Sequence, residues 1–165
     1  MLALQNNWGV MRTKSLVIAS TLAFLITGAH GQQEQRFVLL PASEVSNLAK
    51  DYPQYGPDKI DGSWLPSESQ IGALEANVRH ISDLRNGGAP NGEKIVHPEQ
   101  YYRQYVAVVR AGQSLIYVNA LCRIGNASYW RDHLYRVMDG GSCAWQAWYD
   151  PATEKFLSLS INGRA

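Results

Sequence analysis

Apolar residues recur at helical spacing in the middle of the chain. The positions, separated by three and four residues, are Ile71, Leu74, Val78, Ile81 and Leu84. This spacing places them on one face of a helix. Ser67 precedes them and Gln70 follows three residues later, which is the capping-box pattern of a helix start. We therefore predict an amphipathic helix from Ser67 to about Arg85 with one buried face.

Four segments in the second half of the chain have the composition and alternation of strands. They span residues 101–110, 114–121, 143–149 and 156–162, and a short turn joins the members of each pair. In the last segment Leu157, Leu159 and Ile161 alternate with serines, which predicts one buried face and one face in water. The four strands are expected to form an antiparallel meander.

These elements predict an α+β fold in which one main helix packs on a four-stranded antiparallel meander sheet. A lone helix or sheet would leave its apolar side in water, so each must cover the other. Residues 32–66 are expected to form an N-terminal strand and loop segment, 67–165 the α+β core, and 32–165 a single domain. Arg36–Leu40 is a candidate edge strand, and with it the order of elements is similar to that of cystatin-like folds.

The amino end has the organisation of an export signal. Arg12 and Lys14 precede an apolar run of about a dozen residues, and small residues follow it at the expected cleavage site. A spanning helix needs roughly 20 apolar residues, so the run is short for one. We expect residues 1–31 to be a signal peptide, with Met11 as a candidate start of translation and an exported form beginning near Gln32. The alternative is an uncleaved membrane anchor.

Composition restricts the partners of the exported form. Removing residues 1–31 leaves 134 of the 165 residues, with 13 Lys and Arg against 14 Asp and Glu. This near balance provides no electrostatic attraction to nucleic acid or to an anionic membrane. We expect a periplasmic or secreted protein whose partner is an unknown envelope or extracellular protein or glycan. Neither a nucleic-acid partner nor stable membrane insertion after cleavage is expected.

The chain contains two cysteines, Cys122 and Cys143, and both follow the predicted signal. An exported protein occupies an oxidising compartment, where two cysteines most simply pair. The disulfide would hold the residues between them in a loop of about 20 residues and contribute about 3 kcal/mol.

Short motifs mark the carboxyl end. They are Asp139-Gly140-Gly141, the aromatic strand 145–149, the turn Tyr149-Asp150-Pro151 and the ending Asn162-Gly163-Arg164-Ala165. The combination resembles the C-terminal signature of small exported bacterial proteins of unassigned function. The resemblance implies export and a closing hairpin, and it implies no activity.

The sequence contains none of the known catalytic or cofactor motifs considered below. The residues around Cys143 superficially resemble the cysteine segment of papain-like proteases, but no His follows it. Three histidines, His80, His97 and His133, have no metal-site spacing to one another or to the cysteines. Nucleotide-binding and serine-hydrolase motifs are also absent from the sequence. We expect no cofactor and no metal, and enzymatic activity is less expected than binding.

The segment between the cysteines has the most interaction-like composition. Arg and aromatic side chains are enriched at binding hot spots, so Trp130, Arg131 and Tyr135 are the predicted contact residues for a partner. The simpler interpretation is a solvated loop whose rings cover one edge of the sheet. A rival function is a small envelope-acting hydrolase that uses Asp132, His133 and Asp139. Asp139 before two glycines is also typical of a turn cap.

Overall fold

The structure is a computed structural model that describes residues 35–51, 60–89 and 91–163. The predicted signal peptide lies outside these residues. The elements in chain order are β1 (Phe37–Leu39), α1 (Glu44–Asp51), β2 (Gly62–Ser63), α2 (Glu68–Asn77), η2 (Val78–Asp83), η3 (Pro98–Gln100), β3 (Tyr102–Arg110), β4 (Gln113–Leu121), α3 (Ala127–Asp132), η4 (Gly141–Cys143), β5 (Ala144–Asp150) and β6 (Lys155–Ile161). Among the described helices, none is long and apolar enough to cross a membrane.

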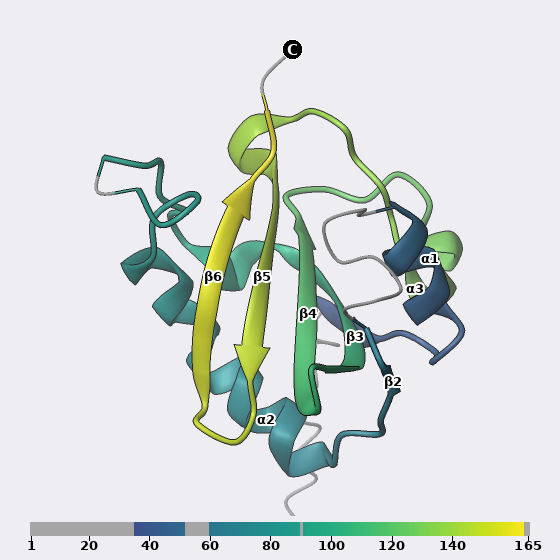
Figure 1. Ribbon diagram of the computed structural model, residues 1–165. Coiled ribbons are helices and arrows are strands. Elements are labelled where there is room, and N and C mark those ends of the chain that lie inside the picture. The colour runs from purple at the N-terminus through teal and green to yellow at the C-terminus, as the bar shows by residue number, and fades with distance from the viewer. Residues whose placement is uncertain (1–34, 52–59, 90, 164–165) are drawn as a thin grey trace, which may run out of the picture. The chain divides into compact units, whose positions relative to one another are not determined.

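The fold is α+β, as predicted, but its sheet is mixed. The strands lie in the order β1-β3-β4-β5-β6, and β2 pairs with the far end of β3 (Figure 1). Strands β3 to β6 form the predicted antiparallel meander. The predicted four-stranded antiparallel sheet is only part of the sheet, because β1, within the candidate edge strand, joins the edge in parallel to β3. Parallel neighbours need a long crossover, which the segment containing α2 provides. The cystatin-like topology stays a prediction.

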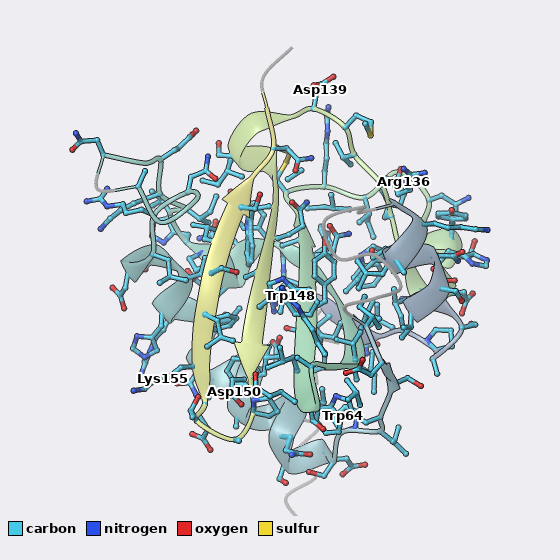
Figure 2. All side chains as sticks on the ribbon, in the orientation of Figure 1. Trp64, Arg136, Asp139, Trp148, Asp150 and Lys155 are labelled. Atoms are coloured by element: carbon cyan, nitrogen blue, oxygen red, sulfur yellow. A yellow bond between two sulfur atoms is a disulfide. The ribbon has the colours of Figure 1, made fainter. Side chains whose placement is uncertain are left out.

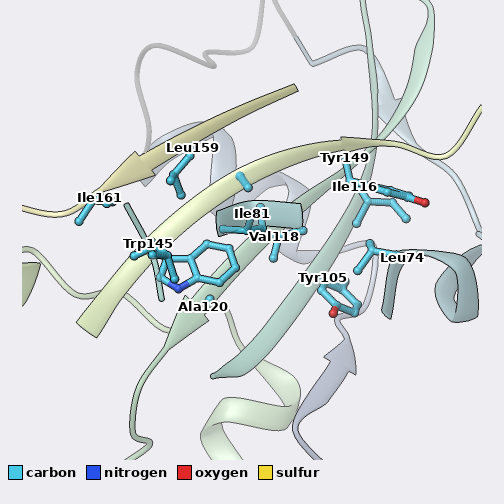
Figure 3. Close-up of a cluster of buried hydrophobic side chains, with 12 residues drawn as sticks. Leu74, Ile81, Tyr105, Ile116, Val118, Ala120, Trp145, Tyr149, Leu159 and Ile161 are labelled. Atoms are coloured by element: carbon cyan, nitrogen blue, oxygen red, sulfur yellow. The ribbon is translucent and has the colours of Figure 1, made fainter. Parts of the chain in front are cut away.

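The predicted amphipathic helix covers one face of the sheet. Ser67 caps it through the expected capping box with Gln70, and the α-helix ends at Asn77 and continues as the 3-10 helix η2. Leu74 and Ile81 are buried among side chains of β3, β4, β5 and β6, which form the main core (Figure 3). The single predicted helix is therefore two consecutive helical elements that share one buried face.

The second face of the sheet is also covered, which the alternation of the last strand did not indicate. Leu48 of α1 packs with Val106, Val108, Tyr117 and Trp148, whose side chains point away from the α2 side. Figure 1 shows α1 and α3 grouped beside β3, away from α2. Only β6 follows the predicted pattern of a wet face, with exposed serines at positions 158 and 160.

A register shift in β6 corrects the prediction for Leu157. Trp148 pairs with Ser158 and Tyr149 pairs with Phe156, so the ladder passes over Leu157. Phe156 consequently turns towards the core and Leu157 is 53% exposed. An irregularity of one residue exchanges the two faces of a strand.

A buried ion pair joins α2 to the sheet. Arg103 is 3% exposed, and its Nη2 lies 2.8 Å from Oε2 of Glu75. The hydroxyl of Tyr105 donates to the same carboxylate. Burial and the neighbouring charge of Glu75 raise the pKa of Tyr105 well above its usual range, so this phenol stays protonated.

The motifs of the carboxyl end come together in space. Asp139 forms a bridge with Gly163, and the backbone N–H of Gly141 donates to the carbonyl of Gly163 at 2.9 Å. Gly140 and Gly141 adopt φ angles of 117° and 54°, a conformation that favours glycine. At the other motif, Asp150 accepts from the backbone N–H of Ala152 at 2.9 Å and closes the β5–β6 turn. In this structure these motifs therefore form turns and a bridge of the backbone.

Candidate functional site

The excursion, defined here as residues 123–142 between β4 and β5, is clamped at its base. Cys122 and Cys143 form the predicted disulfide, with 4.8 Å between their Cα atoms. The backbone N–H of Cys122 also donates to the carbonyl of Cys143 at 2.8 Å. The excursion therefore leaves and re-enters the sheet at one point, which restricts the shapes it can adopt.

A row of buried amides fastens the excursion across the sheet. Gln104 of β3 is fully buried, and its Nε2 donates to the carbonyls of Trp130 and His133, both at 2.6 Å. Its Oε1 accepts from the backbone N–H of Tyr135 at 2.8 Å and from Nδ2 of Asn119 at 3.0 Å. One side chain thus holds both ends of the 130–135 segment, and all its hydrogen-bonding capacity is used.

The row continues along the sheet because the strand register places its members opposite one another. Asn119 pairs with Gln104 in one direction and with Gln146 in the other. Nδ2 of Asn119 donates to the carbonyl of Tyr135 at 2.9 Å, and Nε2 of Gln146 lies 3.4 Å from Oδ1 of Asn119. Sequence analysis did not single out these amides, because only the cross-strand register brings them together.

Glu44 of α1 provides a second fastening, which the sequence analysis also missed. The residue is 3% exposed, and its Oε2 accepts from the backbone N–H of Leu134 at 2.9 Å. Its Oε1 accepts from Nδ2 of Asn47 at 2.9 Å and lies 3.5 Å from Nδ1 of His133. Burial alone would raise the pKa of Glu44, but these hydrogen bonds outweigh burial and lower it. The ionised carboxylate is the form that holds the excursion.

The structure corrects one of the three predicted contact residues. Trp130 is 1% exposed and packs with Leu121 and Ala144, so its ring is not available to a partner. The reason is the short helix α3, whose N-cap Asn126 starts a turn that directs Trp130 towards the sheet. Its neighbour Arg131 is exposed, as expected.

The third predicted residue, Tyr135, contacts a surface group of aromatic rings and also lines a cavity. Its ring lies edge-on to that of Tyr129, with 5.9 Å between centroids, and Tyr129 in turn lies 4.8 Å from the ring of His133. Tyr129 is 47% exposed, so this trio reaches the surface. The half-buried Tyr135 also lines a cavity beneath the excursion.

That cavity, called the clamp cavity below, has a volume of about 470 Å³ and lies beside the disulfide. Such a volume is within the range of small-molecule sites. Its lining is mainly apolar and consists of Leu121, Arg123, Ile124, Gly125, Tyr135, Val137, Gly140, Cys143 and Ala144. The two limbs of the excursion and the ends of β4 and β5 supply these residues, so no single stretch of sequence carries a signal for the cavity.

Among the described residues that line the cavity, Arg123 is the one with a charged side chain. Its side chain is exposed, and it forms no hydrogen bond or ion pair with any residue that the structure describes. On the opposite limb, the hydroxyl of Tyr135 lies close to Gly125, where an added Cβ would be 3.3 Å from it. The cavity therefore combines apolar walls with one cation and one phenol.

The three residues of the rival hydrolase prediction do not converge in the described structure. Asp139 is exposed and lies beside Gly163 at one end of the molecule (Figure 2). No hydrogen bond or ion pair within the described ranges joins it to Asp132 or His133, and none of the three lines the clamp cavity. His133 instead faces the buried carboxylate of Glu44. Residues 35–51, 60–89 and 91–163 also contain no group of three or more acidic, His or Cys side chains that could hold a metal ion.

Comparisons with protein-family models, with curated proteins and with solved structures find no match to this chain. The geometry of the clamp cavity and its surroundings is therefore the basis for a functional proposal.

Proposed function

We propose that this chain is a small exported protein that binds a ligand in the clamp cavity without chemically changing it. The observation that carries the proposal is the lining of the cavity. Its walls are mainly apolar, and the described residues that form them include no carboxylate and no imidazole, as expected for a site that holds a ligand. Imidazole and carboxylate groups directed at a bound substrate are the groups that most often carry out general acid-base catalysis.

The attachment of the excursion supports a preformed site. The disulfide, Gln104 and Glu44 hold the excursion at its base and across its 130–135 segment. A ligand entering such a site orders few additional groups, so less binding free energy is lost as conformational entropy. This arrangement favours binding over a purely structural role.

Export rests on two observations of different kinds. The amino end of the sequence has the pattern of a signal peptide, and the disulfide is consistent with an oxidising compartment. We retain the proposal that the protein acts in the periplasm or outside the cell. A protein or glycan of the envelope is the proposed context of binding, and the cavity adds a site for a small ligand.

The binding of a neutral apolar dye tests this proposal. N-phenyl-1-naphthylamine fluoresces when it leaves water, and we expect saturable binding at one site per chain. Ile124 and Val137 are half-buried cavity residues, so Ile124→Trp and Val137→Trp should each fill part of the space. Each variant is expected to weaken dye binding by about tenfold or more, which corresponds to about 1.4 kcal/mol.

Leu65→Trp is the matched control because Leu65 is 85% exposed and lies outside the clamp cavity. This variant should bind the dye as the wild type does. Circular dichroism and melting curves establish that each variant is folded. The proposal fails if wild-type binding is not saturable, or if both folded cavity variants bind the dye with unchanged affinity.

A further inference from the structure

Arg123, which has no hydrogen-bond or ion-pair partner among the described residues, carries a further inference about the ligand of the clamp cavity. Arg123 is exposed and belongs to the residues that line this mainly apolar cavity. None of the described residues pairs with it. A neutral apolar ligand would make no use of this charge, whereas a ligand with an anionic end would pair with it.

We propose that the clamp cavity takes a small amphipathic carboxylate, with its apolar group inside and its carboxylate on Arg123. This inference rests on the proposed function and names the ligand class of the same site. Guanidinium presents two parallel N–H donors that match the two oxygens of a carboxylate. The phenol of Tyr135, which lies close to Gly125 on the Arg123 limb, is placed to donate a further hydrogen bond.

The charge of the site selects a monoanion. Arg123 provides one positive charge, and no other cationic residue of the described ranges lines the cavity. A phosphate ester carries close to two negative charges at neutral pH and would leave one of them without a partner. The exposed carboxylates of Asp132 and Asp139 belong to the same excursion but do not line the cavity, so they do not occupy the guanidinium.

The size of the cavity limits the apolar group. A volume of about 470 Å³ suits an arylalkyl group or a medium-length alkyl chain. The side chains that surround this group are Leu121, Ile124, Val137 and Ala144. They offer no hydrogen-bonding groups of their own, so the polar part of the ligand must lie at the Arg123 side.

Two pairs of probes, each an acid and its matched alcohol, test the inference. The pairs are 4-phenylbutyrate with 4-phenylbutan-1-ol, and decanoate with decan-1-ol, and their affinities are measured by displacement of N-phenyl-1-naphthylamine. We expect at least one acid to bind about fivefold or more tightly than its alcohol at low salt. This preference should decrease as ionic strength rises, because the pair is partly exposed.

Substitution of arginines locates the charge that is responsible. Arg123→Gln should abolish the preference for the acid, which is measured as the ratio of acid affinity to alcohol affinity in the same variant. Arg79→Gln is the control because Arg79 is an exposed arginine on the opposite side of the sheet, in η2. Arg131→Gln, an exposed arginine of the same excursion outside the cavity lining, should also keep the preference.

The possible outcomes separate this inference from the proposed function. If both acids bind no better than their alcohols while the dye binds saturably, the inference fails and the proposed function stands. If the preference survives Arg123→Gln, or disappears in Arg131→Gln alone, the carboxylate is recognised elsewhere and the inference is overturned. If neither the dye nor any probe binds saturably, both are wrong.

Discussion

Gln104→Leu is the sharpest test of how the excursion is held, because this one side chain makes three hydrogen bonds to the 130–135 segment. Gln104 is fully buried and its amide forms four hydrogen bonds, to the carbonyls of Trp130 and His133, the N–H of Tyr135 and the side chain of Asn119. Leucine has a similar volume, so the substitution removes the hydrogen bonds without creating a large cavity.

The expected cost follows from the groups left behind. The variant leaves two backbone carbonyls and one backbone N–H of the 130–135 segment without their partner, together with one donor position of Asn119. A buried polar group that loses its partner costs about 1–3 kcal/mol. The costs are not additive, because water can reach part of the segment once it loosens. We expect a total loss of about 3–5 kcal/mol in the free energy of unfolding.

Urea denaturation of the oxidised protein measures this loss. Gln113→Leu provides the control, since Gln113 is an exposed residue of β4 and its substitution should change stability by less than about 0.5 kcal/mol. Hydrogen exchange adds a local readout, because the amide of Tyr135 donates directly to Gln104. This amide should exchange much faster in Gln104→Leu than in the wild type.

A loss below about 1 kcal/mol in Gln104→Leu would refute the reasoning. So would an unchanged exchange rate of the Tyr135 amide, because the excursion would then be held by other contacts. In either case the preformed site would lose its main support.

Four other predictions concern the core, the clamp, the carboxylate and the amino end. Leu74 is fully buried, so Leu74→Ala should lower the free energy of unfolding by about 2–5 kcal/mol, and a loss under about 0.5 kcal/mol would contradict the packing of α2. Thiol labelling of the denatured, unreduced protein should detect no free thiol at Cys122 or Cys143, and reduction should cost about 3 kcal/mol while leaving the fold intact. The pKa of Glu44 is lowered in the folded state, so its stabilising effect is complete at neutral pH and is lost as the pH falls through that lowered pKa. The difference in free energy of unfolding between wild type and Glu44→Gln should therefore shrink on acidification. A difference independent of pH would contradict this. The intact mass of protein recovered from an exporting host should correspond to a chain that begins near Gln32, and a mass that retains residues 11–31 would indicate an anchored protein.

The elements of this protein were predictable where local chemistry defines them. The capping box of Ser67 and Gln70 marks the start of α2, and the turn at Ala111–Gly112 joins β3 to β4 at residues that adopt positive φ. The disulfide was predictable from the presence of two cysteines behind a signal-like segment. These features depend on neighbours in the sequence or on the cellular compartment, so the sequence of a single chain is enough to indicate them.

The position of Trp130 shows where local reasoning failed. Its neighbours Tyr129 and Arg131 are both exposed, and nothing in the composition of the segment distinguishes the buried ring from the exposed ones. A single turn of α3, laid against the sheet, decides which of them faces inwards. Trp130→Ala is therefore expected to destabilise the fold by about 3–5 kcal/mol instead of acting on binding alone.

By itself the sequence determined the helix, the meander, the pairing of the cysteines and the segment between them as a candidate binding region. Only the tertiary structure decided that β1 joins in parallel, that both faces of the sheet are covered, and that Arg123 and Tyr135 line one cavity. The physical reason is the range of the interactions. Helical spacing, caps and turns act over a few residues. The amide row and the clamp cavity instead combine residues of different strands and of both ends of the excursion, which meet only when the sheet has formed.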